Sequence, residues 1–576
     1  MDFQRILLWV VFCFSLVMLW DRWEVAHGHK PMFFPVPTQA AAGAGAGAAG
    51  SAAGGAVPAG GVAAATQPGA VPGADAGASA AAPVKPVEIV TDVLRIDIDP
   101  QGGTIVRAVL RKEHRATNWK AEGLAGFISG QKPGPKAHEV LFDHSADRDY
   151  EGQTGLIGGD GFPNHRNTRF TLLPGPTTLA EGQDALRVVL EGQSGGLMLR
   201  KTFVFRRGHY DVNVQQEVKN VGDKAVTPSL YLQLVRDNGQ TGEEGSFYKT
   251  YTGPATYTGE DHYRKIPFKK IAENDVTLPP PAKDGWVAMV QHYFLTAWIP
   301  QESVHREFYV RALSDRLFSV GTILPLGTIA PGASVTRNAI LYVGPQDHRE
   351  LAALAPGLER VEDYGWLDPI AKPLFWLLSA LHRVVGNWGW AIVALTMLIK
   401  LAFYPLSAAG YKSMAKMKEL APRMQRLKEQ CGEDKQKLQL AMMELYKQEK
   451  VNPLGGCLPI MVQIPVFIAL YWVLLGSVEM RNAPWVLWIH DLATPDPWFV
   501  LPAIMMATSW IQYRLQPTPP DPVQARMMMI MPFAFGVMFF FFPSGLVLYY
   551  VLNNGLSILQ QWRINKVIAR SKKAAA

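Results

Sequence analysis

Cysteine is scarce in this chain of 576 residues. Its three cysteines are Cys13, Cys431 and Cys457, so none lies between residues 25 and 350. A disulfide framework is therefore excluded for that long polar stretch. A strong charge of one sign is also lacking, because 56 basic residues oppose 49 acidic ones and leave a formal net charge of +7. This balance is too mild to indicate a nucleic-acid-binding protein.

Acidic residues are missing from the apolar runs in the last third of the chain. No Asp or Glu lies within an apolar core between residues 387 and 478, and none occurs in 497–513 or 527–562. A proton relay or cation carrier normally needs such a carboxylate as a partner for the moving ion. The apolar segments also lack the two similar halves of many secondary transporters. A transporter or channel is therefore kept only as the alternative interpretation.

The N-terminus combines Arg5 with the apolar run ILLWVVFCFSLVMLW, and no small-residue cleavage site follows directly. A basic residue before such a run holds the N-terminus in the cytoplasm. We therefore expect residues 1–24 to form an uncleaved signal anchor, in preference to a cleaved signal peptide. Residues 25–86 follow, and from residue 40 they are almost entirely Ala, Gly and Pro. This composition predicts a flexible, exported linker.

Apolar and polar residues alternate with a period of two after the linker. Leu94, Ile96 and Ile98 alternate with charged residues, as expected for a strand with one buried face. Turn signals such as PQGG and NVGD separate segments of this kind. Residues 87–350 are therefore predicted to form a large antiparallel β-sandwich outside the membrane. No metal-ligand cluster, nucleophile motif or phosphate-binding loop stands out there, so we expect no cofactor, no metal and no catalytic residue.

Apolar segments in the last third predict a helical membrane region. The run IAKPLFWLLSALHRVVG mixes apolar and charged residues, so 366–386 is expected to be an amphipathic helix on the membrane surface. The region 387–565 is the expected helical core, with a cytoplasmic insertion within it. Five apolar segments are long enough to cross a membrane: 387–406, 458–478, 497–513, 527–542 and 544–562. Together with the N-terminal anchor they give six predicted transmembrane helices.

Basic residues indicate the orientation of these segments. Residues 411–450 hold ten Lys and Arg against six Asp and Glu, and the tail 566–576 has no acidic residue. Short cytoplasmic loops retain Lys and Arg, so both segments are expected in the cytoplasm. The loop 479–496 holds one Arg and three acidic residues, which suits the outer side. Both termini are therefore expected in the cytoplasm, with the β-sandwich on the other side of the membrane.

The basic insertion 411–450 has a helical pattern of its own. Apolar residues recur at three- and four-residue intervals on both sides of Gly432. This predicts two amphipathic helices joined in an antiparallel hairpin. The hairpin could be a plain spacer, but its methionines and basic residues favour a contact surface for a partner.

One lysine interrupts the apolar run LTMLIKLAFYP. A charge at the centre of a membrane helix costs about 2.5 to 3.5 kcal/mol on translocon-based scales. Lys400 lies about 6 Å from Tyr404 along the helix axis, so its ammonium group could simply reach the cytoplasmic headgroups. Its neighbours favour a second explanation, because Thr396 and Ser407 share a helix face with Lys400.

Other predicted spans supply further polar side chains. Such residues often only bond neighbouring helices. A cationic stripe joined by amides and hydroxyls from several helices is explained more simply by a hydrated cavity. The candidate residues of this substrate groove are Lys400, Thr396, Gln463, Thr508, Gln512, Tyr550 and Asn554.

Several long motifs in this order resemble a known family. They are MLIKLAFYPLSAAGYKSMAKMKEL, KVNPLGGCLPIMVQIPVFIALYW, RNAPWVLWIHDLATPDP and FPSGLVLYYVLNN. Residues 365–565 closely resemble the YidC family of bacterial membrane protein insertases. The anchor, the linker and a large periplasmic domain follow the Gram-negative type of this family more loosely.

The resemblance implies a five-helix insertase core with a hydrophilic, positively charged groove open to the cytoplasm and to lipid. The intramembrane basic residue of the family falls on Lys400, where members often have arginine. The ammonium group keeps the charge but lacks the planar guanidinium fork. Substrate helices are implied to slide past 458–478 and 527–542 into lipid. The resemblance also implies a periplasmic domain like the galactose mutarotase supersandwich, for which no catalytic acid and base pair is found.

The implied function is insertion and folding of inner-membrane proteins, alone or with the Sec translocon SecYEG, without enzymatic chemistry. The implied partners are nascent membrane proteins, membrane lipids and the ribosome, whose RNA attracts the basic hairpin and tail. A sugar-modifying enzyme in residues 87–345 is a third hypothesis, alongside the transporter or channel.

Overall fold

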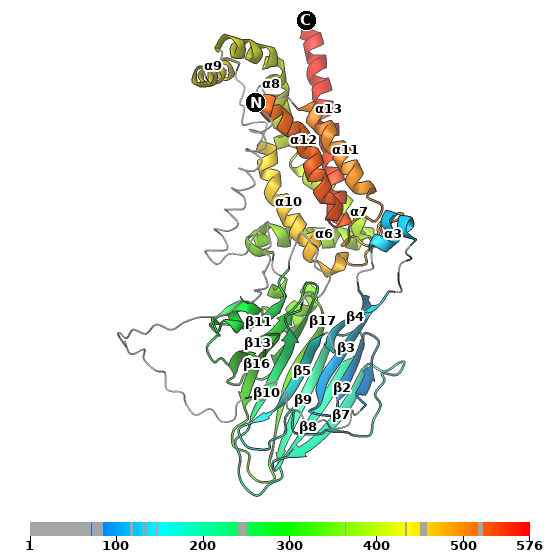
Figure 1. Ribbon diagram of the computed structural model, residues 1–576, viewed down its shortest axis with the longest axis vertical. Coiled ribbons are helices and arrows are strands. Elements are labelled where there is room, and N and C mark those ends of the chain that lie inside the picture. The colour runs from blue at the N-terminus through cyan, green and yellow to red at the C-terminus, as the bar shows by residue number, and fades with distance from the viewer. Residues whose placement is uncertain are drawn as a thin grey trace, which may run out of the picture. The chain divides into compact units, whose positions relative to one another are not determined.

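The computed structural model shows two compact units (Figure 1). Of the described residues, one unit holds the strands, in those up to His114 and in 138–361, and the other unit holds those of 115–137 and those from Glu362 on. The predicted anchor 1–24 and most of the linker 25–86 lie outside the described residues. The structure describes Val71, 85–115, 119–130, Lys132, Gly134, 136–145, 148–239, 250–362, 364–431, 435–449, 458–516 and 522–575.

The first unit consists of two sheets whose strands pair antiparallel. The eight-stranded sheet has the order β1 (Val87–Val90), β2 (Leu94–Asp99), β3 (Thr104–His114), β4 (His138–His144), β5 (Asp149–Ile157), β10 (Ser229–Asp237), β16 (Leu317–Pro325) and β15 (Glu307–Ala312). The nine-stranded sheet has the order β12 (His262–Lys265), β11 (Gly253–Thr258), β13 (Trp286–Val290), β14 (Phe294–Pro300), β17 (Ser334–Pro345), β9 (Asp211–Asn220), β8 (Leu197–Arg206), β7 (Ala185–Ser194) and β6 (Thr171–Leu172).

Buried side chains join the two sheets. The Trp298 indole on β14 donates a hydrogen bond of 3.1 Å to the Gln233 carbonyl on β10. Leu94, Ile96 and Ile98 on β2 are each at most 1% exposed, so the alternation in the sequence marks the face that enters the core. The predicted antiparallel β-sandwich is therefore confirmed. Its assignment to the mutarotase supersandwich stays a prediction.

Short helices complete this unit. They are α4 (Phe268–Ala272), α5 (His348–Leu354) and the 3₁₀ helix η1 (Leu358–Val361). Two further short helices, α2 (Trp119–Glu122) and α3 (Leu124–Ser129), lie between β3 and β4 in sequence but belong to the helical unit.

The helical unit is built on an apolar core. Leu395, Leu470, Leu474 and Val547 are each at most 2% exposed and belong to one cluster. The helices are α6 (Asp368–Val385), α7 (Trp388–Ala402), α8 (Tyr404–Cys431), α9 (Lys435–Gln448), α10 (Leu458–Gly476), α11 (Val500–Leu515), α12 (Pro522–Met538) and α13 (Ser544–Ala575), with the 3₁₀ helices η2 (Gly365–Leu367), η4 (Val478–Met480) and η5 (Phe539–Phe541).

Among the described residues, no single helix is both long and apolar enough to cross a membrane. The helices Trp388–Ala402 and Tyr404–Leu420 meet that test only as a pair bent by 64°. The predicted span 387–406 thus contains a break at Phe403. Pro405 explains it, because proline lacks the N–H needed inside a helix and is tolerated at the start of the next one. The count of six transmembrane helices stays a prediction.

Helices α8 and α9 pack through a small apolar cluster. Leu420 and Met424 are buried, and Met417, Met442 and Leu445 pack against them. An ion pair between Arg423 and Glu449 ties the same two segments together. The glycine and acidic residues expected to join the two helices, 432–434, lie outside the described residues.

Candidate functional site

Lys400 lies in the last turn of α7. This helix begins where the Asn387 side chain accepts a hydrogen bond of 3.1 Å from the Trp390 amide. The Lys400 side chain is 8% exposed, and its Nζ donates a hydrogen bond of 2.7 Å to Ser557 Oγ on α13. Ser557 Oγ in turn donates to the Asn553 carbonyl at 2.7 Å. The ammonium group is therefore held in one place by the neighbouring helix.

The partner of Lys400 carries no charge. Among the described residues, no carboxylate forms an ion pair with the Lys400 ammonium. Moving a charge out of water is costly unless another charge or several dipoles compensate it. A serine hydroxyl compensates only part of that cost.

Helix α13 collects the polar contacts of the site. Its Asn553 side chain accepts a hydrogen bond from the Gln463 amide of α10. Asn554 Nδ2 donates to Ser509 Oγ of α11 at 2.9 Å. Gln561 Nε2 donates to the carbonyl of Leu515, at the end of α11, at 3.1 Å. Polar residues of α13 therefore bind α7, α10 and α11, and Lys400 occupies one point of this polar network.

The other predicted groove residues have different surroundings. Thr396 Oγ1 donates to the Ile392 carbonyl at 2.7 Å, and Thr508 Oγ1 donates to the Met505 carbonyl at 2.9 Å, so both hydroxyls bond their own helix. The Tyr550 ring packs edge-to-face against Phe467, with the ring centroids 4.6 Å apart. Gln512 lies half-buried on α11, one turn after Thr508. That these side chains line a groove stays a prediction.

Four residues of the polar network are absent from the predicted set: Asn553, Ser509, Ser557 and Gln561. Asn553 precedes Ser557 by four residues, so the i, i+4 spacing on one helix face could have found it. Ser509 follows Thr508 directly, so the spacing of polar residues does not show which of the two faces the neighbouring helix. Each is identified only by the helix that its side chain contacts.

The segment between α10 and α11 caps the N-terminal end of α13. The amides of Ser544 and Gly545 donate to the carbonyls of Thr494 and Leu492, at 2.7 and 3.0 Å. These bonds satisfy N–H groups that the first turn of a helix leaves without partners. Ser557 lies 13 residues further along α13, or about 20 Å at 1.5 Å per residue. Lys400 therefore lies well away from this loop, on the side where α8 begins.

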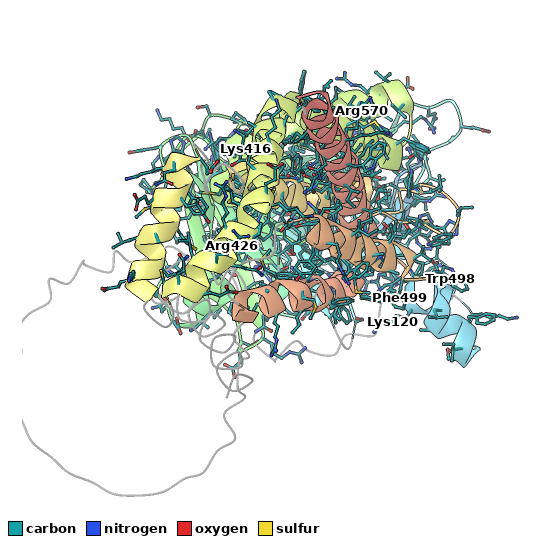
Figure 2. All side chains as sticks on the ribbon, turned by 90° about the horizontal axis from the view of Figure 1, so that it is seen from above. Lys120, Lys416, Arg426, Trp498, Phe499 and Arg570 are labelled. Atoms are coloured by element: carbon teal, nitrogen blue, oxygen red, sulfur yellow. The ribbon has the colours of Figure 1, made fainter. Side chains whose placement is uncertain are left out.

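Apolar side chains remain exposed along the outer faces of the helices. On α12, Ile530 is 54% exposed, Phe533 50% and Val537 59%. Exposed apolar side chains repeated along a helix indicate a surface that meets another apolar phase. Lys416 and Arg426 on α8 and Arg570 on α13 are exposed basic side chains (Figure 2). The helical unit thus combines an apolar surface with a basic one.

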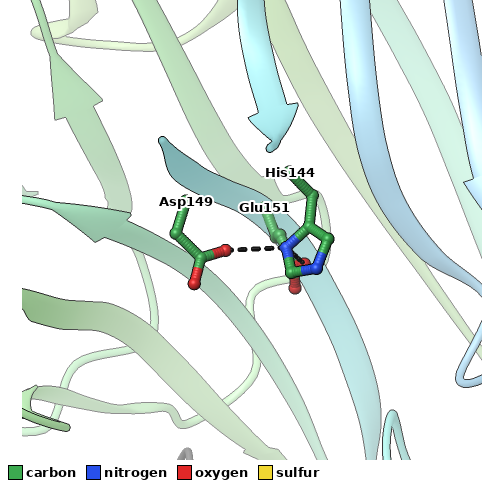
Figure 3. Close-up of side chains that lie close together, drawn as sticks. All are labelled: His144, Asp149 and Glu151. Carbon is green, nitrogen blue, oxygen red and sulfur yellow. Dashed lines mark hydrogen bonds and ion pairs between the residues drawn. The ribbon is translucent and has the colours of Figure 1, made fainter. Parts of the chain in front are cut away.

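A separate cluster of titratable groups lies in the β-sandwich. His144 Nδ1 is 2.8 Å from an oxygen of Asp149 and 2.8 Å from an oxygen of Glu151 (Figure 3). The hydrogen bond to Glu151, aided by Asp149 and opposed by partial burial, raises the pKa of His144 to about 9. The three groups could chelate a metal ion by their spacing. A protonated imidazole between two carboxylates explains the same geometry, so we assign no metal site here.

Known families match both units. Residues 380–572 match the family described as 60Kd inner membrane protein, and residues 86–377 match the YidC periplasmic domain. The membrane protein insertase YidC of Cupriavidus necator is 53% identical over 584 residues, covering 100% of this chain and 99% of the relative. The corresponding protein of Burkholderia multivorans is 50% identical over 577 residues, covering 100% of both chains.

One solved structure is also similar to this chain. The crystal structure of an active YidC insertase with its first transmembrane domain resolved is 18% identical, covers 83% of this chain and 92% of its own, and has a TM-score of 0.36. The transporter or channel alternative finds no support in these comparisons. Since the family models cover most of the chain and full-length relatives are about half identical, the chain belongs to the YidC family of membrane protein insertases, inner-membrane proteins with a periplasmic domain.

Proposed function

We propose that the protein inserts membrane proteins by presenting the uncompensated charge of Lys400 to polar segments that must cross the membrane. The observation that supports this is the 2.7 Å bond between the buried Lys400 ammonium and a neutral hydroxyl, with no acidic partner among the described residues. An acidic segment entering the site gains an attraction that is stronger in a low-dielectric surrounding than in water. It can leave again, because no covalent bond forms.

The apolar part of the substrate follows a different route in this proposal. Met461 and Ile464 of α10, and Met529 and Phe533 of α12, are at least 46% exposed. Methionine and phenylalanine side chains adapt to helices of varied shape. A substrate helix therefore slides past 458–478 and 527–542 into lipid, while its polar end stays near Lys400. The remaining candidates for the groove are Thr396, Gln463, Thr508, Gln512, Tyr550 and Asn554.

The proposed topology has six transmembrane helices, both termini in the cytoplasm, and helix 366–386 on the membrane surface. The bent pair α7 and α8 then brings the chain out of the membrane, and the exposed Lys416 and Arg426 lie beyond the bend. Basic side chains in such a position are typical of cytoplasmic segments. The hairpin 411–450 and the tail 566–576 would face the ribosome, whose RNA attracts basic side chains.

The other proposed partners are the Sec translocon SecYEG, membrane lipids and nascent inner-membrane proteins, whose folding the protein also assists. The β-sandwich serves in binding or scaffolding in this proposal. It carries no enzymatic step and needs no cofactor.

Reconstituted insertion tests the proposal. The full chain is placed in liposomes, and insertion of a small substrate is scored by protease protection of its translocated segment. Lys400→Glu should abolish insertion of a substrate with an acidic segment and spare most insertion of one with a neutral segment. Lys400→Arg keeps the charge and should retain activity with both.

Lys566→Glu is the matched control, because it makes the same charge change on an exposed part of α13. It should insert both substrates as the unaltered protein does. Equal insertion of the acidic substrate by Lys400→Glu and by the unaltered protein would exclude a role for the charge. Loss of both substrates in Lys400→Glu, with normal thermal stability, would show that the lysine acts in a different way.

A further inference from the structure

Residues 115–137 form an insertion between two strands of the β-sandwich, and this insertion belongs to the helical unit. Strands β3 and β4 pair as far as His114 and His138, whose rings lie 4.8 Å apart. The chain between them, residues 115–137, groups with the helices and not with the strands. It carries α2 and α3, which are only four and six residues long.

This insertion is seated on the segment that leads into α11. The Leu124 amide donates a hydrogen bond of 3.0 Å to the Pro497 carbonyl. The Trp119 ring meets the Phe499 ring edge-to-face, with the centroids 6.0 Å apart. Figure 2 shows Lys120, Trp498 and Phe499 gathered at this place.

A glycine permits the close approach. A Cβ atom added to Gly123 would lie 1.8 Å from the Pro497 carbonyl oxygen, far inside van der Waals contact. Any other residue at this position would therefore push the two segments apart. Gly134, in the same insertion, has nothing within 4 Å of such an atom.

The outer face of α3 is apolar and uncovered. Phe127 is 78% exposed and Ile128 is 75% exposed, and Leu124 and the adjacent Trp498 are each 39% exposed. The Phe127 and Trp498 rings lie 6.2 Å apart, so these side chains form one surface. We call Leu124, Phe127, Ile128 and Trp498 the α3 patch. Such a patch on a folded protein indicates an interaction surface.

The insertion that carries this patch is basic. Residues 115–137 contain Arg115, Lys120, Lys132 and Lys136 against one acidic residue, Glu122. All four basic side chains are exposed. Exposed aromatic and aliphatic side chains framed by Lys and Arg are typical of segments that lie in the headgroup region of an anionic membrane. A second copy of this chain fits less well, because a two-fold contact would bring the same basic residues together.

We propose that the α3 patch inserts into the periplasmic leaflet of the membrane, with its basic frame on anionic phospholipid headgroups. The patch lies beside Trp498 and Phe499, which directly precede a helix of the inner-membrane core, where aromatic residues commonly mark the membrane interface. Because both ends of the insertion lead into paired strands, it ties the periplasmic domain to the membrane surface. This inference does not depend on the role proposed for Lys400.

A fluorescent probe tests the inference in the full chain. The three cysteines are replaced by serine, Phe127→Cys is introduced and labelled with an environment-sensitive dye, and the protein is placed in vesicles of phosphatidylethanolamine and phosphatidylglycerol. The expected result is a blue-shifted emission that is quenched by lipids carrying a nitroxide high on the acyl chain. The same dye on Lys224→Cys, an exposed site in a turn of the sandwich, should show neither effect.

Two glycine variants test whether the contact between the insertion and Pro497 positions the α3 patch. Gly123→Ala should reduce the quenching at position 127, whereas Gly134→Ala should leave it unchanged. Emission at position 127 that matches the Lys224→Cys site would overturn the inference. So would a blue shift without quenching by nitroxide lipids, since a protein surface would then cover the patch. Unchanged quenching in Gly123→Ala would show that the contact with Pro497 does not position it.

Discussion

The Nζ atom of Lys400 and the Oγ atom of Ser557 lie 2.7 Å apart, although 157 residues separate them in the chain. The Ser557 hydroxyl donates its own hydrogen bond to the Asn553 carbonyl, so its oxygen is oriented to accept from the lysine. A neutral acceptor fixes the position of the ammonium group without cancelling its charge. The pair therefore positions a cation. Unlike an internal salt bridge, it does not neutralise the positive charge.

A carboxylate placed at residue 557 should cancel that charge. Ser557→Asp supplies a permanent partner for Lys400, so an acidic substrate segment must compete with it. A hydrogen bond to a charged group contributes about 1.5 to 3 kcal/mol, which predicts a roughly tenfold or greater loss of insertion of acidic substrates. Protease protection of acidic and neutral substrates in liposomes measures the effect.

Ser557→Asn is the control for this prediction, because it keeps a neutral acceptor near the lysine. It should lose much less activity than Ser557→Asp. Equal activity of the aspartate and asparagine variants with the acidic substrate would contradict the idea that the free charge matters.

Close packing between α7 and the loop before α11 gives a second prediction. A Cβ atom on Gly389 would lie 2.2 Å from the Trp485 ring, so Gly389→Ala forces one of them to move. Overpacking of this kind costs about 1 to 3 kcal/mol. Gly555→Ala on α13 has nothing within 4 Å and should be neutral or stabilising by up to about 1 kcal/mol. Thermal unfolding in detergent micelles should rank the two variants in this order, and equal unfolding temperatures would contradict it.

The sequence allowed the β-sandwich to be predicted because its signal is local. Alternation at Leu94, Ile96 and Ile98 depends on a period of two and on one buried face. The break at Phe403 was harder to predict, because the apolar character continues through it and only Pro405 marks the new helix. The helices α2 and α3 were missed, because four and six residues are too few to show a helical period.

The site was predictable only in part, for a different reason. A single lysine in an apolar run is conspicuous, so the charge of Lys400 and its polar neighbours on the same helix face led to its prediction as a groove residue. The adjacent Asn553 and Asn554 contact different helices, α10 and α11. A one-dimensional pattern shows that both are polar but not which neighbour each one faces.

The contact between Gln463 and Asn553 predicts a measurable coupling between α10 and α13. Gln463→Leu and Asn553→Leu each remove one amide of a pair that joins the two helices. Side-chain hydrogen bonds between membrane helices contribute about 0.6 kcal/mol on average and at most about 1.7. A double-mutant cycle of unfolding free energies in micelles should give a coupling in this range. Gln463→Leu combined with Asn554→Leu is the control, and it should show additive losses because Asn554 bonds Ser509 instead.

The His144 cluster predicts a pH dependence in the β-sandwich. The folded pKa of His144 is raised to about 9 from an ordinary value of 6.5, chiefly by its hydrogen bond to Glu151. A raised pKa means that the folded state binds the proton more tightly. The stabilisation is therefore complete below about pH 6.5 and is lost as the pH rises through about 9. Since the His144 side chain is 61% exposed, solvent screening limits the contribution to about 1 kcal/mol or less.

Hydrogen exchange of residues 138–157 in the full chain should detect this effect. His144→Gln should lower protection relative to the unaltered protein below pH 6.5, and the difference should vanish above pH 9. Comparing the two proteins at each pH removes the intrinsic pH dependence of exchange. His305→Gln replaces another exposed histidine of the same unit and should leave protection of these strands unchanged at both pH values. A difference for His144→Gln that stays constant from acid to alkaline pH would mean that packing, and not the protonated imidazole, holds β4 and β5 together here.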